Sequence, residues 1–348
     1  MNTTRAAKPH EAIGKTLTIK KIIGKMGALL ALIVLCLLIG IATRGRFFAT
    51  SNLMNVLRQV SINCFIAAGM LLVLITAGID LSVGFNAVLA TCVMGVMVKG
   101  GFTFSPVLIL VALVIAGIVG YINGTLLTRL SLPHPFVSTL GMKFVTWGLA
   151  LIVTSATPIG LSGKGVDGML WLGSAAVPGT KAIGRLPMSF VAVVVLYVIM
   201  HIFLTRTELG RKIYCVGGNP EASRLSGIDC DKVLRIVYTM SGLLCGLAGI
   251  VLAGRVATAD PNAGATFDTD AIAACIVGGA SFTGGKGSMG GTLVGAMIIA
   301  VIRNGLNLLG ASTDVQYVVI GLVIILAVLI DVMRAKAEAN ARKQAMIK

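Results

Sequence analysis

Ten stretches of the chain carry almost no charge, and polar segments separate them. They are residues 27–42, 60–79, 84–98, 106–128, 137–156, 188–204, 236–254, 271–285, 287–309 and 315–330. A helix needs roughly 20 apolar residues to cross a bilayer core about 30 Å thick. The pattern therefore predicts an all-α polytopic membrane protein with about ten transmembrane helices. Stretches 84–98 and 271–285 are the shortest, so we expect short, broken or re-entrant helices there, shielded by their neighbours.

The composition supports this class. Hydrophobic residues make up 56% of the chain and charged residues 12%, against about 45–50% and about 25% in soluble domains. These values exclude most soluble enzymes, a disordered chain and a disulfide-stapled secreted module.

The basic residues predict how the chain is oriented. The net charge is +16, from 29 Lys and Arg and 13 acidic residues. Nineteen of the 29 fall in segments that an N-inside arrangement places in the cytoplasm, and eight fall in external segments. Because positive charge concentrates on the cytoplasmic side, we expect an inner-membrane protein with a cytoplasmic N-terminal tail (1–26), a single transmembrane domain (27–333) and a cytoplasmic C-terminal tail (334–348). The basic clusters flank apolar stretches and face the lipid bilayer, so no nucleic-acid partner is expected.

No pattern of residues indicates catalysis, a metal or a cofactor. The seven cysteines form no CxxC pair and the three histidines form no HExxH, so we expect no metal site and no cofactor. The sequence Gly14-Lys15-Thr16 resembles the end of a P-loop, but Pro9 stands where the first glycine is required. We therefore expect a chain without ATP-hydrolysing machinery of its own.

Two features suggest interrupted helices. Asp80 stands between apolar stretches with Gly78 and Gly84 on either side. It is equally well interpreted as the N-cap of the next helix or as a functional carboxylate in the membrane. The glycine-rich stretch 278–291 favours an unwound segment, whereas isolated glycines such as Gly246 favour close packing between helices.

A weak internal similarity predicts an inverted repeat. Asp80 precedes a short apolar stretch, and the following stretch ends in Tyr121-Ile122-Asn123-Gly124. Asp270 likewise precedes a short stretch, and the following one ends in Ile302-Arg303-Asn304-Gly305. In the ten-span arrangement these two units cross the membrane in opposite directions, as inverted repeats do.

The longest polar interior segment, 205–235, encodes a short helix outside the membrane. Asn219 is a favourable N-cap, Pro220 suits the first helical position, and Glu221 lies in the first turn. Gly227 fits a left-handed stop. A helix over 220–226 is too short to be stable alone, so we expect it to contact a cytoplasmic partner.

These segments resemble one family. AGIDLSVG at 77–84, PFVSTLGM at 135–142, GRKIYCVGGNPEASRLSGI at 210–228 and DAIAACIVGGASFTGGKGSMGGTLVGA at 270–296 are similar to the permease subunits of bacterial ATP-binding cassette sugar importers, nearest the ribose, galactoside and allose group. NGLNLLG at 304–310 and GLVIILAVLID at 321–331 agree. The resemblance covers about residues 27–333.

The resemblance implies import of a monosaccharide, a ribose-like pentose or a related hexose. It implies three protein partners: a cytoplasmic ATP-binding cassette ATPase, a periplasmic sugar-binding protein and a second permease, either an identical copy or a paralogue. It also implies that the segment 205–235 is the coupling loop where the permease meets the ATPase. The expected coupling residues are Asn219, Pro220, Glu221, Arg224, Leu225 and Gly227.

We expect polar residues in and beside the apolar stretches to line the sugar path: Asn63, Asp80, Ser82, Asn86, Asn123, Thr146 and Asn304. For any single one of them, a hydrogen bond between helices is the simpler interpretation. The rival hypothesis is an ion-coupled secondary transporter of a small polar solute, with Asp80, Lys143 or Arg303 in its relay. An intramembrane enzyme is disfavoured, because no nucleophile–base pair or set of metal ligands is apparent.

Overall fold

The computed structural model describes residues 27–130, 134–177 and 185–347, so the N-terminal tail expected at 1–26 lies outside the described residues. The described chain is mainly helical, with four two-residue strands. The helices are Gly27–Ala42, the 3-10 helix η1 (Arg46–Phe48), α2 (Thr50–Ile75), α3 (Val83–Lys99), α4 (Ser105–Arg129), α5 (Pro135–Thr154), α6 (Asp167–Ser174), α7 (Met188–Arg206), α8 (Glu208–Gly218), α9 (Pro220–Leu225), α10 (Cys230–Val256), α11 (Phe267–Val277), α12 (Met289–Leu308) and α13 (Thr313–Ile347).

Each of the ten predicted stretches contains an apolar helix, but the helices differ in length. Within the described residues, seven are long and apolar enough to cross a membrane: α2, α4, α5, α7, α10, α12 and residues 313–333 of α13. Gly27–Ala42 and α3 are shorter. The expectation that stretches 84–98 and 271–285 form short helices is confirmed.

The stretch 271–285 is only partly helical. Its helix, α11, has 11 residues, or about 16 Å at 1.5 Å per residue, about half of a bilayer core. Residues 278–288, called the glycine loop below, follow it without regular structure. Gly279, Gly284 and Gly285 have positive φ there, which other residues rarely adopt. The unwound segment that the glycines predict is therefore present.

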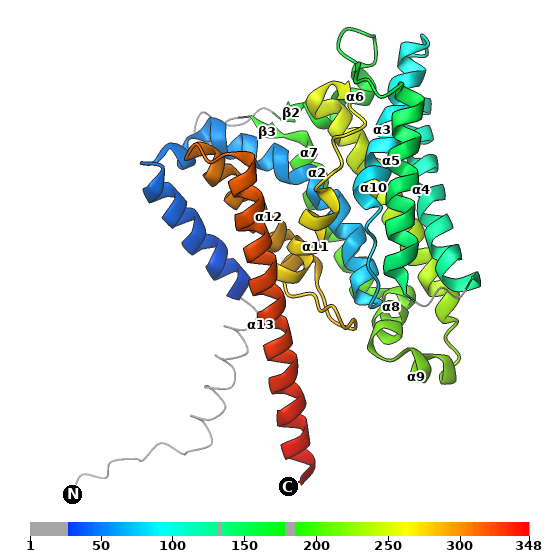
Figure 1. Ribbon diagram of the computed structural model, residues 1–348, viewed down its shortest axis with the longest axis vertical. Helices are drawn as coiled ribbons and strands as arrows, with labels where there is room; N and C mark the ends of the chain where they lie inside the picture. The colour runs from blue at the N-terminus through cyan, green and yellow to red at the C-terminus, as the bar shows by residue number, and fades with distance from the viewer. Residues whose placement is uncertain (1–26, 131–133, 178–184, 348) are drawn as a thin grey trace, which may run out of the picture.

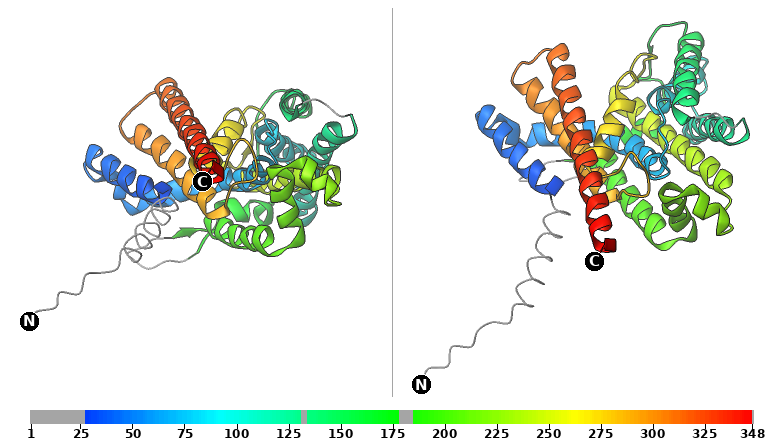
Figure 2. Two further views of the ribbon diagram at one scale, coloured as in Figure 1. Left: turned by 90° about the horizontal axis from the view of Figure 1, so that it is seen from below. Right: turned by 60° about the horizontal axis from the view of Figure 1, so that its bottom comes forward.

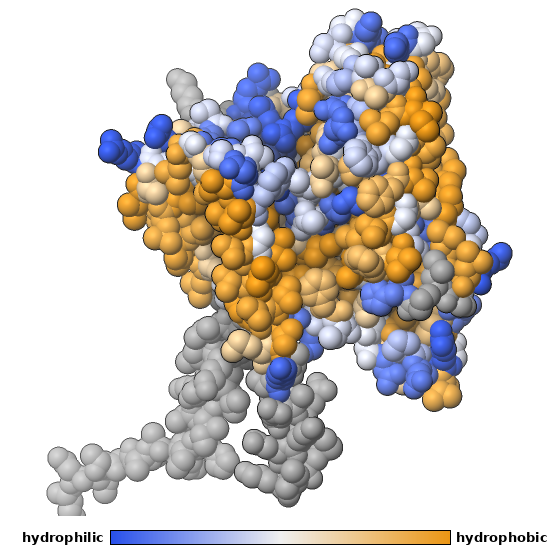
Figure 3. Space-filling view, in the orientation of Figure 1, coloured by the Kyte–Doolittle hydropathy of each residue, from blue (hydrophilic) through white to orange (hydrophobic). Residues whose placement is uncertain are grey.

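Helices α2 and α10 form the centre of the bundle (Figures 1 and 2). In their most apolar windows, 83% and 72% of the residues are buried, against 11% in α13. Because the outer helices present apolar side chains outward, apolar residues cover much of the visible surface and polar residues gather toward its two ends (Figure 3). This is the surface of a chain whose surroundings are lipid.

Close approach of α10 to α4 depends on isolated glycines. A Cβ on Gly120 would overlap the carbonyl oxygen of Tyr238, and one on Gly242 would overlap that of Ala116. The packing interpretation of the isolated glycines is thereby confirmed for this helix pair.

The helices pack as an inverted repeat. Helix α2 contacts α10, α11 and α12, whereas α10 contacts α2, α3 and α4. Exchanging α2 with α10, α3 with α11 and α4 with α12 therefore reproduces the pattern. The contacts of α5 with α3 and of α13 with α11 obey the same exchange.

The molecule has two polar ends, which we call the strand side and the α9 side. The strand side carries α6 and two antiparallel pairs, β1 (Ile159–Gly160) with β4 (Thr258–Ala259) and β2 (Ala176–Val177) with β3 (Leu186–Pro187). The α9 side carries α8, α9, the glycine loop and the end of α13 (Figure 1). Helix α3 ends near the strand side and α11 ends at the glycine loop, so the two short helices point in opposite directions, as the inverted repeat predicts.

Candidate functional site

The two short helices begin beside each other inside the bundle. Irregular segments, 76–82 and 257–266, bring the chain to this point from opposite sides of the molecule. A Cβ on Gly84 would press on the carbonyl oxygen of Gly264, and one on Gly264 would press on that of Gly84. Only glycine allows this approach, which brings the N-terminal turns of α3 and α11 together. We call this place the junction.

Asp80 is held at the junction by its neighbours. Its Oδ1 accepts hydrogen bonds from the backbone N–H of Ser82 at 2.9 Å and from its hydroxyl at 2.6 Å. The amide of Asn123 on α4 donates to the Ser82 hydroxyl at 2.9 Å and more weakly to Asp80 at 3.5 Å. All three side chains are buried. The sequence-predicted residues Asp80, Ser82 and Asn123 thus form one cluster just before α3.

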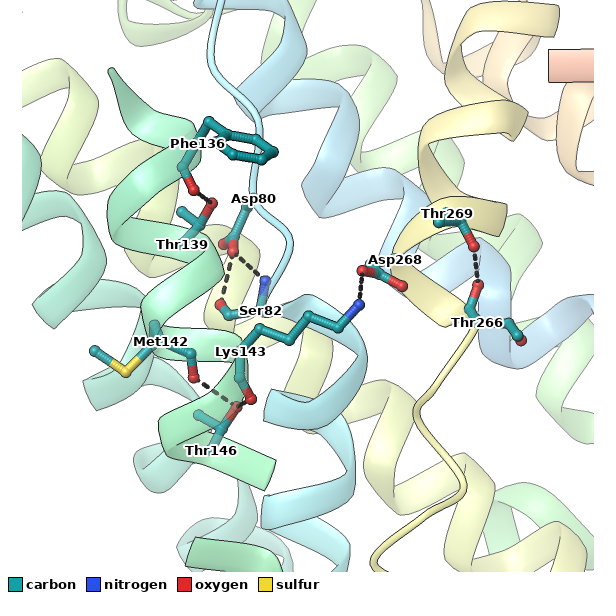
Figure 4. A network of polar contacts seen from close by, with 10 residues as sticks. All are labelled: Asp80, Ser82, Phe136, Thr139, Met142, Lys143, Thr146, Thr266, Asp268 and Thr269. Carbon is teal, nitrogen blue, oxygen red and sulfur yellow. Dashed lines mark hydrogen bonds and ion pairs between the residues drawn. The ribbon is translucent and has the colours of Figure 1, made fainter. Parts of the chain in front are cut away.

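Asp268 brings a second carboxylate to the junction, from the first turn of α11. Its Oδ2 lies 2.6 Å from Nζ of Lys143, which reaches across from α5 (Figure 4). The Asp268 side chain is 1% exposed and the Lys143 side chain 22%. In the N-inside arrangement of ten spans, Asp268 falls in the external segment between stretches 236–254 and 271–285, which predicts an exposed loop position. That expectation is wrong, because α11 begins at Phe267 and turns both of its acidic residues inward.

Asp270 makes the corresponding contact with α12. Its Oδ1 lies 2.7 Å from Nη2 of Arg303, and both side chains are largely buried. Carboxylates in a first helical turn also interact favourably with the helix dipole. The positive end of α11 therefore helps to hold Asp268 and Asp270 within a mainly apolar bundle.

A polar cavity of about 130 Å³ adjoins the second ion pair. Gln59 and Asn63 of α2, Arg255 of α10, and Asp270 and Arg303 line it together with seven other residues. The Asn63 Oδ1 and the Arg303 Nε are buried without a hydrogen-bond partner in the described structure. Water fits such a site, because the space holds several molecules and the lining offers unsatisfied polar atoms.

The remaining predicted path residues lie elsewhere in the bundle. The Asn86 amide donates to the carbonyl of Ala116, which ties α3 to α4. Thr146 donates to carbonyls of its own helix, and Asn304 exchanges two hydrogen bonds with Asn52. The contacts of Asn86 and Asn304 are the bonds between helices that the sequence favoured as the simpler interpretation, whereas those of Thr146 stay within its own helix.

The predicted short helix outside the membrane is confirmed. Helix α9 begins at Pro220, and the Asn219 side chain accepts a hydrogen bond from the Ala222 N–H at 3.0 Å. Gly227 has φ +80°. Arg224 lies 3.7 Å from Asp231, whereas the Leu225 side chain is 91% exposed. A leucine so exposed beyond the membrane-spanning helices leaves its apolar surface in water.

The predicted polar loop 205–235 has more structure than the sequence indicated. Residues 208–218 form helix α8, and α10 begins at Cys230, six residues before the predicted span. Helix α8 is amphipathic. Its buried face consists of Gly210, Ile213, Val216 and Gly217 and packs against the bundle.

Helix α8 connects α9 to the glycine loop. The Tyr214 hydroxyl donates to the carbonyl of Gly287 at 2.8 Å. A Cβ on Gly217 would overlap the carbonyl oxygen of Ile75, which also accepts the N–H of Gly285 at 2.8 Å. The end of α2, helix α8 and the loop that follows α11 therefore meet without free space. A displacement of α9 and α8 has a direct mechanical route to α11.

The arrangement is that of a transport protein. It has an apolar bundle, two interrupted helices with buried charges between them, and a connecting element at one end, whereas no three His, Cys, Asp or Glu of the described residues could hold a metal ion. The family model for the permease component of branched-chain amino acid transport systems matches residues 52–328. The chain belongs to this family, the permeases of ATP-binding cassette importers, as its motifs predicted.

Curated relatives align over most of their length. The chain is 39% identical to the ribose import permease protein of Bacillus subtilis over 88% of this chain and 92% of that one. It is 36% identical to the fructose import permease protein of Rhizobium meliloti (87% and 84%) and 33% identical to the D-allose transport system permease protein of Escherichia coli (90% and 93%). No solved structure matches the chain significantly.

Sequence reasoning missed how the charged residues pair. Lys143 and Arg303 were noted as charges within spans, but their partners, Asp268 and Asp270, were assigned to a loop. One signal was available: two lone cations inside apolar stretches require buried counter-charges, and Asp268 and Asp270 are two of the few acidic residues near apolar sequence.

Proposed function

We propose that this permease imports a monosaccharide, a ribose-like pentose or a related hexose, and that a separate subunit hydrolyses the ATP. The relatives named above include permeases for ribose, fructose and allose, and they align along nearly the whole chain. An external sugar-binding protein delivers the sugar on the strand side, and the ATPase binds on the α9 side, which faces the cytoplasm. A second permease, identical or paralogous, completes the transporter.

The observation that carries the coupling role is the exposure of Leu225. Interfaces are anchored by a few apolar or aromatic side chains that become buried in a pocket of the partner. Helix α9 presents such an anchor on a capped helix, flanked by the charges of Glu221 and Arg224. Asn219, Pro220 and Gly227 set the two ends of this helix and so fix the direction in which Leu225 points.

The junction is the part of the bundle best suited to change shape during transport. The two segments that lead to it, 76–82 and 257–266, have irregular backbone, and its polar groups lie in the middle of an otherwise apolar protein. The contacts of α8 with the glycine loop supply a route from the ATPase to α11. Asp80, Ser82 and Asn123 on one side, and Asn63 in the polar cavity on the other, are the predicted path residues nearest this moving part.

The ion-coupled secondary transporter is the weaker hypothesis. Lys143 and Arg303, which that mechanism assigns to an ion relay, each lie within 2.7 Å of a carboxylate. Uptake that is sensitive to vanadate and survives collapse of the proton gradient supports ATP-driven import. Uptake that stops with the gradient contradicts it.

Leu225→Ala tests the coupling role directly. Burial of a leucine side chain contributes about 1.5–3 kcal/mol, so truncation to Ala is expected to weaken ATPase binding by about 2 kcal/mol, or roughly 30-fold. The matched control is Leu309→Ala. Leu309 is 50% exposed and lies on the opposite side of the membrane. The assay is titration of the purified ATPase against the permease in nanodiscs, followed by sugar uptake in proteoliposomes. Equal ATPase affinity for the two variants would refute the docking role of α9.

A further inference from the structure

A groove between α4 and α10 combines an apolar wall with two cations at one end. Tyr121 of α4 and Lys232, Arg235, Ile236, Thr239 and Met240 of α10 line it. We call it the α4–α10 groove. Its volume is about 360 Å³, within the range of about 300–1,000 Å³ usual for sites that bind small organic molecules.

The cations of this groove lie in the first two turns of α10, at its end on the α9 side. Helix α10 begins at Cys230 on the α9 side, so Lys232 and Arg235 lie about 3 Å and 8 Å into the helix at 1.5 Å per residue. Met240 lies about 15 Å in by the same measure, at the depth of acyl chains. The groove thus changes from cationic to apolar along the membrane normal.

Both cations lack a partner in the described part of the chain. The nearest acidic residue in sequence, Asp231, is paired with Arg224 on α9 instead. The Thr239 hydroxyl donates to the carbonyl of Arg235, which leaves the wall of the groove without a free donor at that position. Tyr121 is 50% exposed and presents an aromatic ring, the side-chain type that gathers near membrane interfaces.

The groove also opens to the lipid rather than to the interior. Helix α4 forms the right-hand edge of the molecule in Figure 1, and that edge is largely apolar in Figure 3. Glycines hold α4 and α10 in contact: a Cβ on Gly124 would lie 2.8 Å from the Cα of Arg235. The floor of the groove is therefore fixed, whereas its side toward the membrane is open.

We propose that the α4–α10 groove binds one anionic phospholipid. Lys232 and Arg235 hold the phosphate of its headgroup, and Ile236, Met240 and the ring of Tyr121 contact an acyl chain. Charge complementarity selects an anionic lipid, since each cation near a membrane surface contributes about 1 kcal/mol of attraction. The proposal requires only that α4 and α10 span the bilayer, so it stands independently of the transported solute.

The test uses the full-length permease in phosphatidylcholine nanodiscs that contain a small fraction of photoactivatable phosphatidylglycerol. Mass spectrometry of the labelled peptides is expected to find the lipid on residues 117–125 and 236–243. Unlabelled phosphatidylglycerol should displace it far better than phosphatidylcholine. In K232Q/R235Q the apparent affinity should fall about 30-fold, which corresponds to about 1 kcal/mol per cation.

Three further variants keep the result interpretable. Arg206→Gln removes an exposed cation at the same end of α7 and should change nothing. Lys232→Gln alone, at the exposed end of the groove, should weaken lipid binding about 5-fold. This single variant replaces K232Q/R235Q if the double variant folds poorly. Met240→Trp fills the apolar end and should abolish labelling with both cations intact.

Several results would overturn the proposal. They are equal labelling of α7 and α13, equal displacement by phosphatidylcholine, an effect of Arg206→Gln as large as that of the double variant, or protection of the groove by the bound ATPase.

Discussion

Lys143→Met is the most informative perturbation of the junction, because the two residues of the pair differ in exposure. Removing Lys143 leaves the carboxylate of Asp268, 1% exposed, with no counter-charge, and its Oδ1 already lacks a hydrogen-bond partner. Removing the carboxylate by Asp268→Asn leaves the ammonium of Lys143, 22% exposed. A lysine can extend its flexible chain toward water, whereas Asp268 is fixed in a helical turn. The two single variants should therefore differ in cost.

The structure allows rough magnitudes. An unpaired buried charge costs about 3–5 kcal/mol, which applies to Lys143→Met. Loss of a hydrogen bond to a charged group costs about 1.5–3 kcal/mol, and Asp268→Asn should fall at the low end because its partner rehydrates. The double variant removes both charges, so it should be more stable than Lys143→Met alone. At about 2–4 °C per kcal/mol, the unfolding midpoint of Lys143→Met should fall by roughly 6 °C or more.

Buried cysteines supply the assay. Cys64, Cys92, Cys230, Cys245 and Cys275 are free and buried, so a thiol-reactive fluorophore reports unfolding of the purified permease in detergent. Lys164→Met, at an exposed lysine of the strand side, controls for the substitution itself. The expected order of midpoints is wild type, then Asp268→Asn and the double variant, then Lys143→Met. If Lys143→Met were no less stable than Asp268→Asn, the carboxylate would be solvated and the pair would not join α5 to α11.

Two further predictions concern topology and coupling. A reporter active only outside the cytoplasm should be silent when fused at Lys348 and active near Lys164; a bright C-terminal fusion would reverse the assigned orientation. Gly217→Ala should destabilise the contact of α8 with α2 by about 1–3 kcal/mol through overpacking and lower sugar-stimulated ATPase activity, because its Cβ overlaps the Ile75 carbonyl. Gly218→Ala, with nothing within 4 Å of its Cβ, should be neutral, and equal effects of the two would show that α8 does not transmit force.

Much of the fold follows from local sequence. Charge-free stretches located all ten apolar helices, because in lipid a spanning backbone must satisfy its own hydrogen bonds and therefore forms helices. The cap at Asn219 and the stop at Gly227 predicted α9 to within one residue, because both signals act over a single turn. Helix α8 was missed although its buried residues Gly210, Ile213, Val216 and Gly217 recur at the spacing of three to four that indicates a helix.

The junction depends on contacts that no local pattern contains. Asp268 and Lys143 are 125 residues apart, and Asp270 and Arg303 are 33 apart. These ion pairs can be predicted only if one knows which helices pack against each other. The sequence indicated that order only through the similarity between the units that begin at Asp80 and Asp270. Had that similarity been extended, α11 would have been placed opposite α3, with Asp268 and Asp270 near its buried start.

The inverted repeat also accounts for the location of the charges. Two short helices, α3 and α11, start in the middle of the bundle, and each leaves unpaired N–H groups and a positive dipole end there. Carboxylates compensate both, and Asp80, Asp268 and Asp270 occupy those places. Three carboxylates so close together would repel one another, and Lys143 and Arg303 offset that repulsion from α5 and α12. Lys143 of α5 pairs with Asp268 of α11 across the two repeats, whereas Arg303 of α12 pairs with Asp270 of α11 within the second repeat. A relative movement of the two repeats must therefore strain the Lys143–Asp268 pair, and the junction is where a displacement that arrives through α8 would meet electrostatic resistance.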